Sequence, residues 1–270
     1  MVPDGPGRFA AARPGPVAEL PTRAGHPHRP VPAVPRVRGG RAAATVGRVT
    51  EAEREAEREA EREIAPLGTV GVGPWEGPWP DDPRYDRELL ATGDRRNVVD
   101  RYRYWTVEAI VADLDTRRHP FHVAIENWQH DLNIGTVVRT ANAFLAAEVH
   151  VVGRRRWNRR GAMVTDRYQH VRHHPDVAAL LGWARAGGLP LLAVDNLPGA
   201  RPLEIEPLPR ACVLLFGQEG SGLSDEARNA ADGVLSIAQF GSTRSINAGV
   251  AAGIAMHAWV RQHADLRTAW

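Results

Sequence analysis

Three short polar motifs carry the residue types that could bind a charged ligand or take part in proton transfer. The first contains Asn133 and Arg139, the second is a glycine-rich run around Glu219, and the third contains Ser245 and Asn247. The N–H fork of an arginine matches a phosphate group, and glycines let a backbone come close to a ligand. The motifs therefore indicate a site for a charged ligand, with a carboxylate and an arginine available for acid–base or electrostatic work.

Each motif also has a plainer interpretation. Asn133 could cap a helix with Arg139 in solvent, the glycines could form an ordinary turn, and Ser245 or Asn247 could cap the final helix. The glycine-rich run 214–226 lacks the Lys-Ser/Thr end of a phosphate-binding loop. Its glycine spacing also differs from the dinucleotide fingerprint, which argues against a nicotinamide-dependent oxidoreductase.

All three motifs lie where a predicted strand meets a predicted helix. Apolar runs predict strands over 121–127, 148–153, 189–196, 211–217 and 234–240. Helical patterns cover 105–118, 133–146, 175–188, 224–232 and 246–263. Apolar strands that alternate with helices predict an α/β fold, a mostly parallel sheet with helices on both faces. Ligands collect beyond the carboxyl ends of such strands, so we expect Asn133 and Arg139 to lie near one crevice.

The chain divides into three predicted regions. Residues 1–84 are rich in Pro and Arg and contain the repeated EAER tract of 51–63, a composition typical of a disordered tail. Residues 85–118 form an N-terminal extension with one predicted helix, capped by Thr106. Residues 119–265 form the folded domain that contains the three motifs.

Charge and composition narrow the classes of partner. All 34 basic residues are arginine and the net charge is only +2, so nucleic-acid binding must come from a local patch. The run RRRWNRRG follows a predicted strand and offers phosphate pairing together with a stacking plane. It predicts an RNA-binding loop made of Arg154, Arg155, Arg156, Trp157, Arg159 and Arg160.

Several other classes of site are not expected. The single cysteine, Cys212, lies in an apolar run and predicts a buried, inert thiol. His170, His173 and His174 lie close in sequence, but no carboxylate or cysteine near them completes a metal site, so we expect no metal. The sequence shows no signal-peptide core and no apolar span of membrane length, which predicts a cytoplasmic protein.

Together the motifs resemble the SpoU (TrmH) family of RNA ribose 2′-O-methyltransferases, part of the SPOUT superfamily. That family has Asn-x5-Arg-Thr-Ala, then Gly-x-Glu-x-x-Gly-Leu, then Ser-Leu-Asn before the last helix. The corresponding runs here are 133–141, 217–223 and 245–247. Two departures are the Ala238-Gln239 pair, where the family has Pro-Met, and Ile246 in place of Leu.

The resemblance implies a C-terminal deep trefoil knot, a homodimer with the active site near the subunit interface, and S-adenosyl-L-methionine as the methyl donor. It implies that Arg139 acts on the ribose hydroxyl, either as the base or by stabilising the alkoxide or binding a phosphate. The residues implied to position Arg139 and the ribose are Asn133, Glu219, Ser245 and Asn247. Those implied to hold the cofactor are Val194, Gly217, Ile237, Ser245 and Ile246.

Two questions stay open at the level of sequence. A non-catalytic RNA-binding protein that keeps the fold is the alternative to an enzyme, although the retained Asn133, Arg139, Glu219 and Asn247 favour the enzyme. The RNA could be tRNA or rRNA. Residues 85–118 are too short for an additional RNA-recognition domain, which slightly favours tRNA.

Overall fold

A computed structural model describes residues 71–127, 133–218 and 220–269 of the chain, and its central feature is one seven-stranded parallel sheet. The strand order is β3-β2-β1-β6-β4-β7-β5, and every pairing is parallel. This confirms the predicted parallel α/β sheet. The strands are β1 Phe121–Asn127, β2 Val149–Gly153, β3 Val171–His174, β4 Leu191–Val194, β5 Arg201–Pro202, β6 Cys212–Phe216 and β7 Gly233–Ser236.

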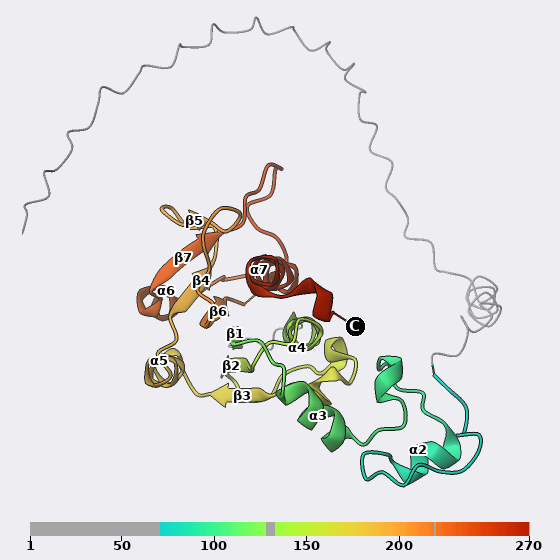
Figure 1. Ribbon diagram of the computed structural model, residues 1–270. Helices are drawn as coiled ribbons and strands as arrows, with labels where there is room; N and C mark the ends of the chain where they lie inside the picture. The colour runs from blue at the N-terminus through green and yellow to red at the C-terminus, as the bar shows by residue number, and fades with distance from the viewer. Residues whose placement is uncertain (1–70, 128–132, 219, 270) are drawn as a thin grey trace, which may run out of the picture. The chain divides into compact units, whose positions relative to one another are not determined.

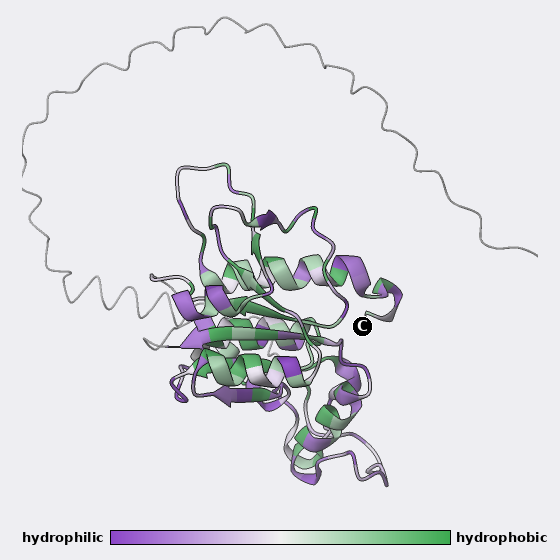
Figure 2. Ribbon diagram, turned by 90° about the vertical axis from the view of Figure 1, so that its left-hand side faces the viewer, coloured by the Kyte–Doolittle hydropathy of each residue, from purple (hydrophilic) through white to green (hydrophobic). Residues whose placement is uncertain are grey.

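Helices cover both faces of the sheet, as Figure 1 shows. Two of them, α4 (Asn133–Ala143) and α7 (Ala248–His263), share a core with Phe121, Val123 and Ile125 of β1. The other two, α5 (Val177–Ala186) and α6 (Asp225–Ala230), pack on the opposite face. Because alternate side chains of a strand point to opposite faces, each central strand contributes to both cores. The central strands are accordingly mostly apolar (Figure 2).

The helix ends agree with the predicted caps. Thr106 and Asn247 accept backbone N–H groups at the starts of α3 (Val107–Asp115) and α7. Ser224 does the same at the start of α6. Such caps satisfy N–H groups that have no partner within the helix. Four short 3₁₀ turns complete the described secondary structure: η1 Asp100–Tyr102, η2 Arg160–Ala162, η3 Thr165–Arg167 and η4 Leu266–Thr268.

Two strands were not predicted, and both lie at the margins of the sheet. β3 pairs with β2 alone, and its sequence VRHH has no apolar run. β5 has only two residues, both exposed. Edge strands need little apolar surface, so hydrophobic periodicity does not reveal them.

The N-terminal segment 71–118 corrects two predictions. The proposed tail ended at residue 84, but Val72 bridges to Asp94 and the ring of Trp75 lies 5.4 Å from that of Tyr104. The extension also contains two α-helices rather than one, α2 (Arg87–Thr92) and α3 (Val107–Asp115). Residues 1–70, including the EAER tract, lie outside the described residues.

Buried polar contacts and aromatic packing hold this segment together and attach it to the sheet domain. Asp94 is fully buried and pairs with Arg96 at 2.7 Å between Oδ2 and Nη2. Ile110 and Leu114 of α3 pack against Tyr168 of the sheet domain. Across the described residues, no helix combines the length and the apolar character needed to cross a bilayer.

Candidate active site

The first and third motifs meet in a direct hydrogen bond. The side-chain amide of Asn247 donates to Oδ1 of Asn133 at 2.8 Å, although the two residues are 114 positions apart. Asn247 also caps α7, because its Oδ1 accepts the N–H of Val250 at 3.1 Å. Its amide is therefore fixed in orientation, with one end on the helix and the other on Asn133. Asn133 itself is buried at the start of α4.

Two polar residues at the end of β1 position the neighbouring loops, and sequence reasoning missed both. Glu126 is fully buried and accepts the backbone N–H of Ser224 at 2.8 Å, which ties β1 to the loop that follows β6. Asn127 donates to the carbonyls of Arg154 and Arg156, at 2.7 and 2.9 Å. The signal was available in the sequence, since Glu and Asn end an otherwise apolar strand, and a buried polar side chain requires a partner.

The glycine-rich loop after β6 folds back on itself. A side chain at position 217 would overlap the backbone of Gly222 and Leu223, so only glycine fits there. Gly220 and Gly222 have positive φ angles of 103° and 68°, which glycine adopts without strain. Oδ2 of Asp195, just after β4, accepts the N–H of Leu223 at 3.4 Å. The loops that leave β4 and β6 are thus joined at the carboxyl edge of the sheet.

The residues implied to hold the cofactor lie in loops at this same edge. Val194 ends β4 and Gly217 follows β6, and both are buried. Ile237 follows β7 and packs partly against the core. Ile246 is half-buried and Ser245 is exposed, just before Asn247. Glu219, a predicted site residue in the glycine-rich loop, lies outside the described residues.

Two buried amide oxygens in these loops have no hydrogen-bond partner. They are Oε1 of Gln218, after β6, and Oε1 of Gln239, after β7. The other end of the Gln218 amide donates to Oγ of Ser221 at 2.6 Å. A buried acceptor without a partner is costly, so both oxygens fit a ligand that brings N–H donors into the loops.

Arg139 is not part of the hydrogen-bonded group that contains Asn133, and its place in the same crevice stays a prediction. Its side chain is exposed, and it makes no hydrogen bond or ion pair with the described residues. Six helical residues separate it from Asn133, a rise of about 9 Å and a rotation of about 240°. The two side chains therefore leave α4 in different directions, and Arg139 presents a free cation to solvent.

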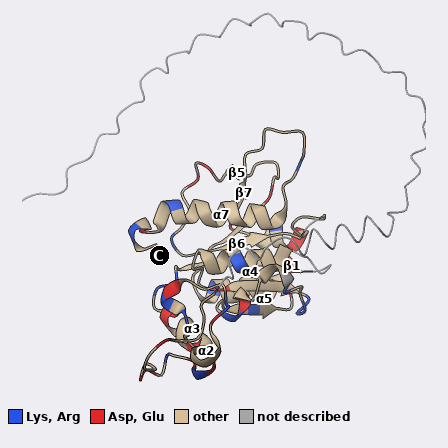
Figure 3. Ribbon diagram, turned by 90° about the vertical axis from the view of Figure 1, so that its right-hand side faces the viewer, with Lys and Arg blue, Asp and Glu red and all other residues tan. Residues whose placement is uncertain are grey.

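The helix that packs against α4, α7, also carries exposed apolar side chains. Val250 and Ile254 are 53% and 40% exposed. Thr136 on the same helix as Arg139 contacts the side of α7 at Gly249, which agrees with the close approach expected from the small residues of α7. Figure 3 shows α7 without charged residues over most of its length and basic only toward its C-terminal end.

The predicted RNA-binding loop is exposed and basic. Arg154, Arg155 and Arg156 are exposed, and their backbone path is held by Asn127. Trp157 packs partly against the core and lies 5.5 Å from the guanidinium of Arg159. The side chain of Arg160 lies outside the described residues. A hollow of about 410 Å³ is lined here by Arg155, Trp157, Arg159, His170 and Arg172, among others.

The fold and these motifs define a chain of the SPOUT type, and comparison with known proteins gives the family. Residues 120–257 match the SpoU rRNA Methylase family. The chain belongs to that family.

Individual relatives agree with this assignment. The chain is 32% identical over 199 residues to a protein of Mycolicibacterium vanbaalenii named "Uncharacterized tRNA/rRNA methyltransferase", over 67% of this chain and 60% of the relative. It is 28% identical to the tRNA (guanosine(18)-2′-O)-methyltransferase of Thermus thermophilus, over 54% of this chain and 77% of that enzyme. The TrmH/SpoU tRNA modifying enzyme of A. aeolicus has the same fold, with a TM-score of 0.52, 21% identity and coverage of 58% and 81%.

Proposed function

We propose that this chain transfers a methyl group from S-adenosyl-L-methionine to a ribose 2′-hydroxyl of RNA. The observation that carries the proposal is the Asn247–Asn133 hydrogen bond, which joins two motifs 114 residues apart at the carboxyl edge of the sheet. A relative whose name specifies the 2′-oxygen of guanosine 18 in tRNA supports the ribose and tRNA as the target.

The cofactor would lie among the loops that follow β4, β6 and β7. Val194, Gly217, Ile237, Ser245 and Ile246 would hold it, and the unpartnered oxygens of Gln218 and Gln239 supply acceptors for its amino groups. S-adenosyl-L-methionine would supply an electrophilic methyl on a sulfonium. The family's deep trefoil knot is proposed for the same segment, in which the loop after β6 already packs its own backbone at Gly217.

In the reaction a bond forms between the 2′-oxygen and the methyl carbon while the sulfur–carbon bond breaks, and the hydroxyl proton is lost to the base or to solvent. The protein must align the hydroxyl and stabilise the negative charge that develops on its oxygen. Arg139 fits the second task as a permanent cation. Asn133, Asn247, Ser245 and Glu219 would position the ribose and its neighbours.

A homodimer would explain the position of Arg139. A second copy on the α4–α7 surface would cover Val250 and Ile254 and would bring Arg139 toward the partner's site. The exposed Arg154–Arg156 and the hollow beside them would then bind the RNA backbone next to the site. The positive charge of this loop supports RNA as the substrate.

The cofactor and substrate can be tested on the purified full chain. Thermal-shift titration with S-adenosyl-L-methionine, NAD and ATP should show stabilisation by the first alone. Transfer of labelled methyl to tRNA and rRNA pools from a strain that lacks this gene should then label tRNA more strongly. Binding of S-adenosyl-L-methionine without transfer to either pool would favour a non-catalytic RNA-binding protein, and stabilisation by NAD or ATP alone would reject the proposal.

A further inference from the structure

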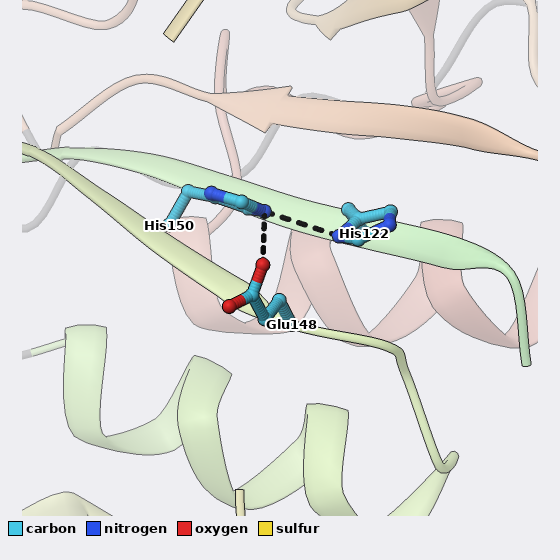
Figure 4. Close-up of side chains that lie close together, drawn as sticks. All are labelled: His122, Glu148 and His150. Atoms are coloured by element: carbon cyan, nitrogen blue, oxygen red, sulfur yellow. Dashed lines mark hydrogen bonds and ion pairs between the residues drawn. The ribbon is translucent and has the colours of Figure 1, made fainter. Parts of the chain in front are cut away.

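A group of metal-ligating side chains lies at the other end of the sheet from the candidate active site. His122 is the second residue of β1, whereas Asn127 ends that strand, about 16 Å farther along it. Glu148 immediately precedes β2 and His150 is the second residue of β2, and both lie beside His122. Their ligand atoms all lie within 4.8 Å of one another (Figure 4).

The geometry of the three residues converges on one nitrogen. Nε2 of His150 lies 3.1 Å from Nδ1 of His122 and 3.9 Å from Oε2 of Glu148. Two ligands of a tetrahedral zinc ion, each about 2.0–2.1 Å from it, lie about 3.3 Å apart. The separations of 3.1 Å and 3.9 Å lie on either side of that value. Small side-chain movements would therefore allow one ion to contact His122, Glu148 and His150.

Neighbouring side chains fix His150 and Glu148 in an orientation that suits metal binding. Nδ1 of His150 lies 2.9 Å from Nε2 of His174, a contact that leaves Nε2 of His150 free for an ion when the proton is on Nδ1. The guanidinium of Arg172 holds both oxygens of Glu148: Nη2 donates to Oε1 at 2.9 Å, and Nε donates to Oε2 at 3.1 Å. This pairing fixes the carboxylate with Oε2 on the side of His150. Hydrogen bonds of this kind to ligating His and carboxylate groups are typical of metal sites.

The cluster is mostly buried. His150 is fully buried, and the ring of Trp183 from α5 lies 4.2 Å from its ring. Imidazole nitrogens are common metal ligands in proteins. Glu148 is 19% exposed and His122 is half-buried, which leaves a route from solvent.

We propose that His122, His150 and Glu148 form a site for one divalent transition metal ion, with zinc as the best fit to two imidazoles and one carboxylate. The ion would join β1 to β2 on the face covered by α5 and would stabilise the sheet there. Sequence reasoning weighed only His170, His173 and His174, because His122 is 26 and 28 positions from the other two ligands. This proposal does not depend on the methyl-transfer reaction.

The test uses the full chain, stripped of metal with a chelator and dialysed. Titration with Zn²⁺ followed by calorimetry should show one equivalent bound, together with a higher melting temperature. Co²⁺ in place of Zn²⁺ should give the intense visible absorption of a tetrahedral or five-coordinate site. His122→Gln and Glu148→Gln should each weaken Zn²⁺ binding at least about 100-fold. Circular dichroism without metal checks that each variant is folded.

His170→Gln is the matched control. His170 also contacts a carboxylate, with Nε2 2.8 Å from Oδ1 of Asp115, but it is not part of the His122–Glu148–His150 cluster found among the described residues. Zn²⁺ binding should be unchanged in this variant. Three results would each overturn the proposal: no Zn²⁺ binding by the wild-type chain, no Co²⁺ spectrum, or wild-type Zn²⁺ affinity in both His122→Gln and Glu148→Gln. The histidines would then be a metal-free, hydrogen-bonded row.

Discussion

The carboxyl edge of the sheet and the N-terminal segment 71–118 use polar residues in opposite ways. At the edge, Arg154–Arg156 are exposed, and farther along α4 Arg139 is exposed too and makes no hydrogen bond or ion pair with the described residues. In the N-terminal segment, Asp94 is fully buried and satisfied by Arg96 and by the N–H of Tyr104. Exposed cations are available to a ligand, whereas a buried, satisfied carboxylate contributes to stability. Substitutions in the two regions should therefore affect different measurements.

The largest effect on activity is expected from Arg139→Ala. Loss of the cation that stabilises the developing alkoxide should reduce methyl transfer on the order of 10³-fold. Binding of S-adenosyl-L-methionine and the melting temperature should change little, because Arg139 is exposed and makes no hydrogen bond or ion pair with the described residues. Single-turnover methyl transfer and calorimetry measure the two quantities. The matched control is Arg185→Ala, an exposed arginine on α5 on the opposite face, and equal activity in both variants would remove Arg139 from the mechanism.

Replacement of Arg154, Arg155 and Arg156 by Gln should weaken RNA binding on the order of 10²-fold at moderate salt. The dependence of log K on log salt should become less steep by about 2 to 3, because up to three phosphate contacts are lost. The loop path should survive, since Asn127 holds backbone carbonyls there rather than side chains. Filter binding over a salt series provides the measurement. An unchanged slope would place the RNA elsewhere.

Asp94→Asn should have the reverse effect, on stability rather than on chemistry. Removal of one partner of a buried pair costs about 3 kcal/mol, which urea unfolding and hydrogen exchange over 71–118 can measure. Asp100→Asn, whose side chain is 99% exposed in the same segment, is the control and should be near neutral. If Asp94→Asn were as stable as the wild type but transferred methyl groups more slowly, Asp94 would contribute to activity, and the proposed difference between the two regions would be wrong.

The same carboxylate predicts a pH dependence. Burial raises the pKa of Asp94, but hydrogen bonds from Arg96 and from the backbone N–H groups of Arg96 and Tyr104 outweigh it, and the pKa lies below its usual value of 3.8. The folded state therefore binds this proton more weakly than the unfolded chain. The stabilisation is complete above the unfolded pKa and is lost as pH falls through the folded pKa. Acid unfolding below pH 4 should be less steep in Asp94→Asn.

The smallest effect is expected from Cys212, which lies in the core away from both regions. Burial raises its pKa to about 12, so the thiolate is scarce at neutral pH. A thiol reagent at pH 8 should leave the native chain unmodified and should modify it fully in denaturant. Rapid native modification, followed by mass spectrometry, would show that the core opens there.

The two regions also differ in how far the sequence predicts them. The strands and helices at the edge were predictable because they have clear periodicities and caps, and Asn133 and Asn247, which the structure joins, lie in recognisable motifs. Segment 71–118 depends on contacts such as Trp75 with Tyr104 and Asp94 with Arg96, which have no period. Glu126 was missed for a similar reason, since its partner Ser224 is 98 residues away.

The central claim is methyl transfer to the ribose 2′-oxygen, and nucleoside mass spectrometry tests it most directly. RNA from a strain that lacks the gene should be incubated with the purified chain and S-adenosyl-L-methionine, digested to nucleosides and analysed by fragmentation. The account predicts that the ribose fragment of one nucleoside becomes heavier by about 14 mass units, because one methyl group replaces one hydrogen. A methyl group on the base fragment, or no new methyl in any RNA pool, would contradict it.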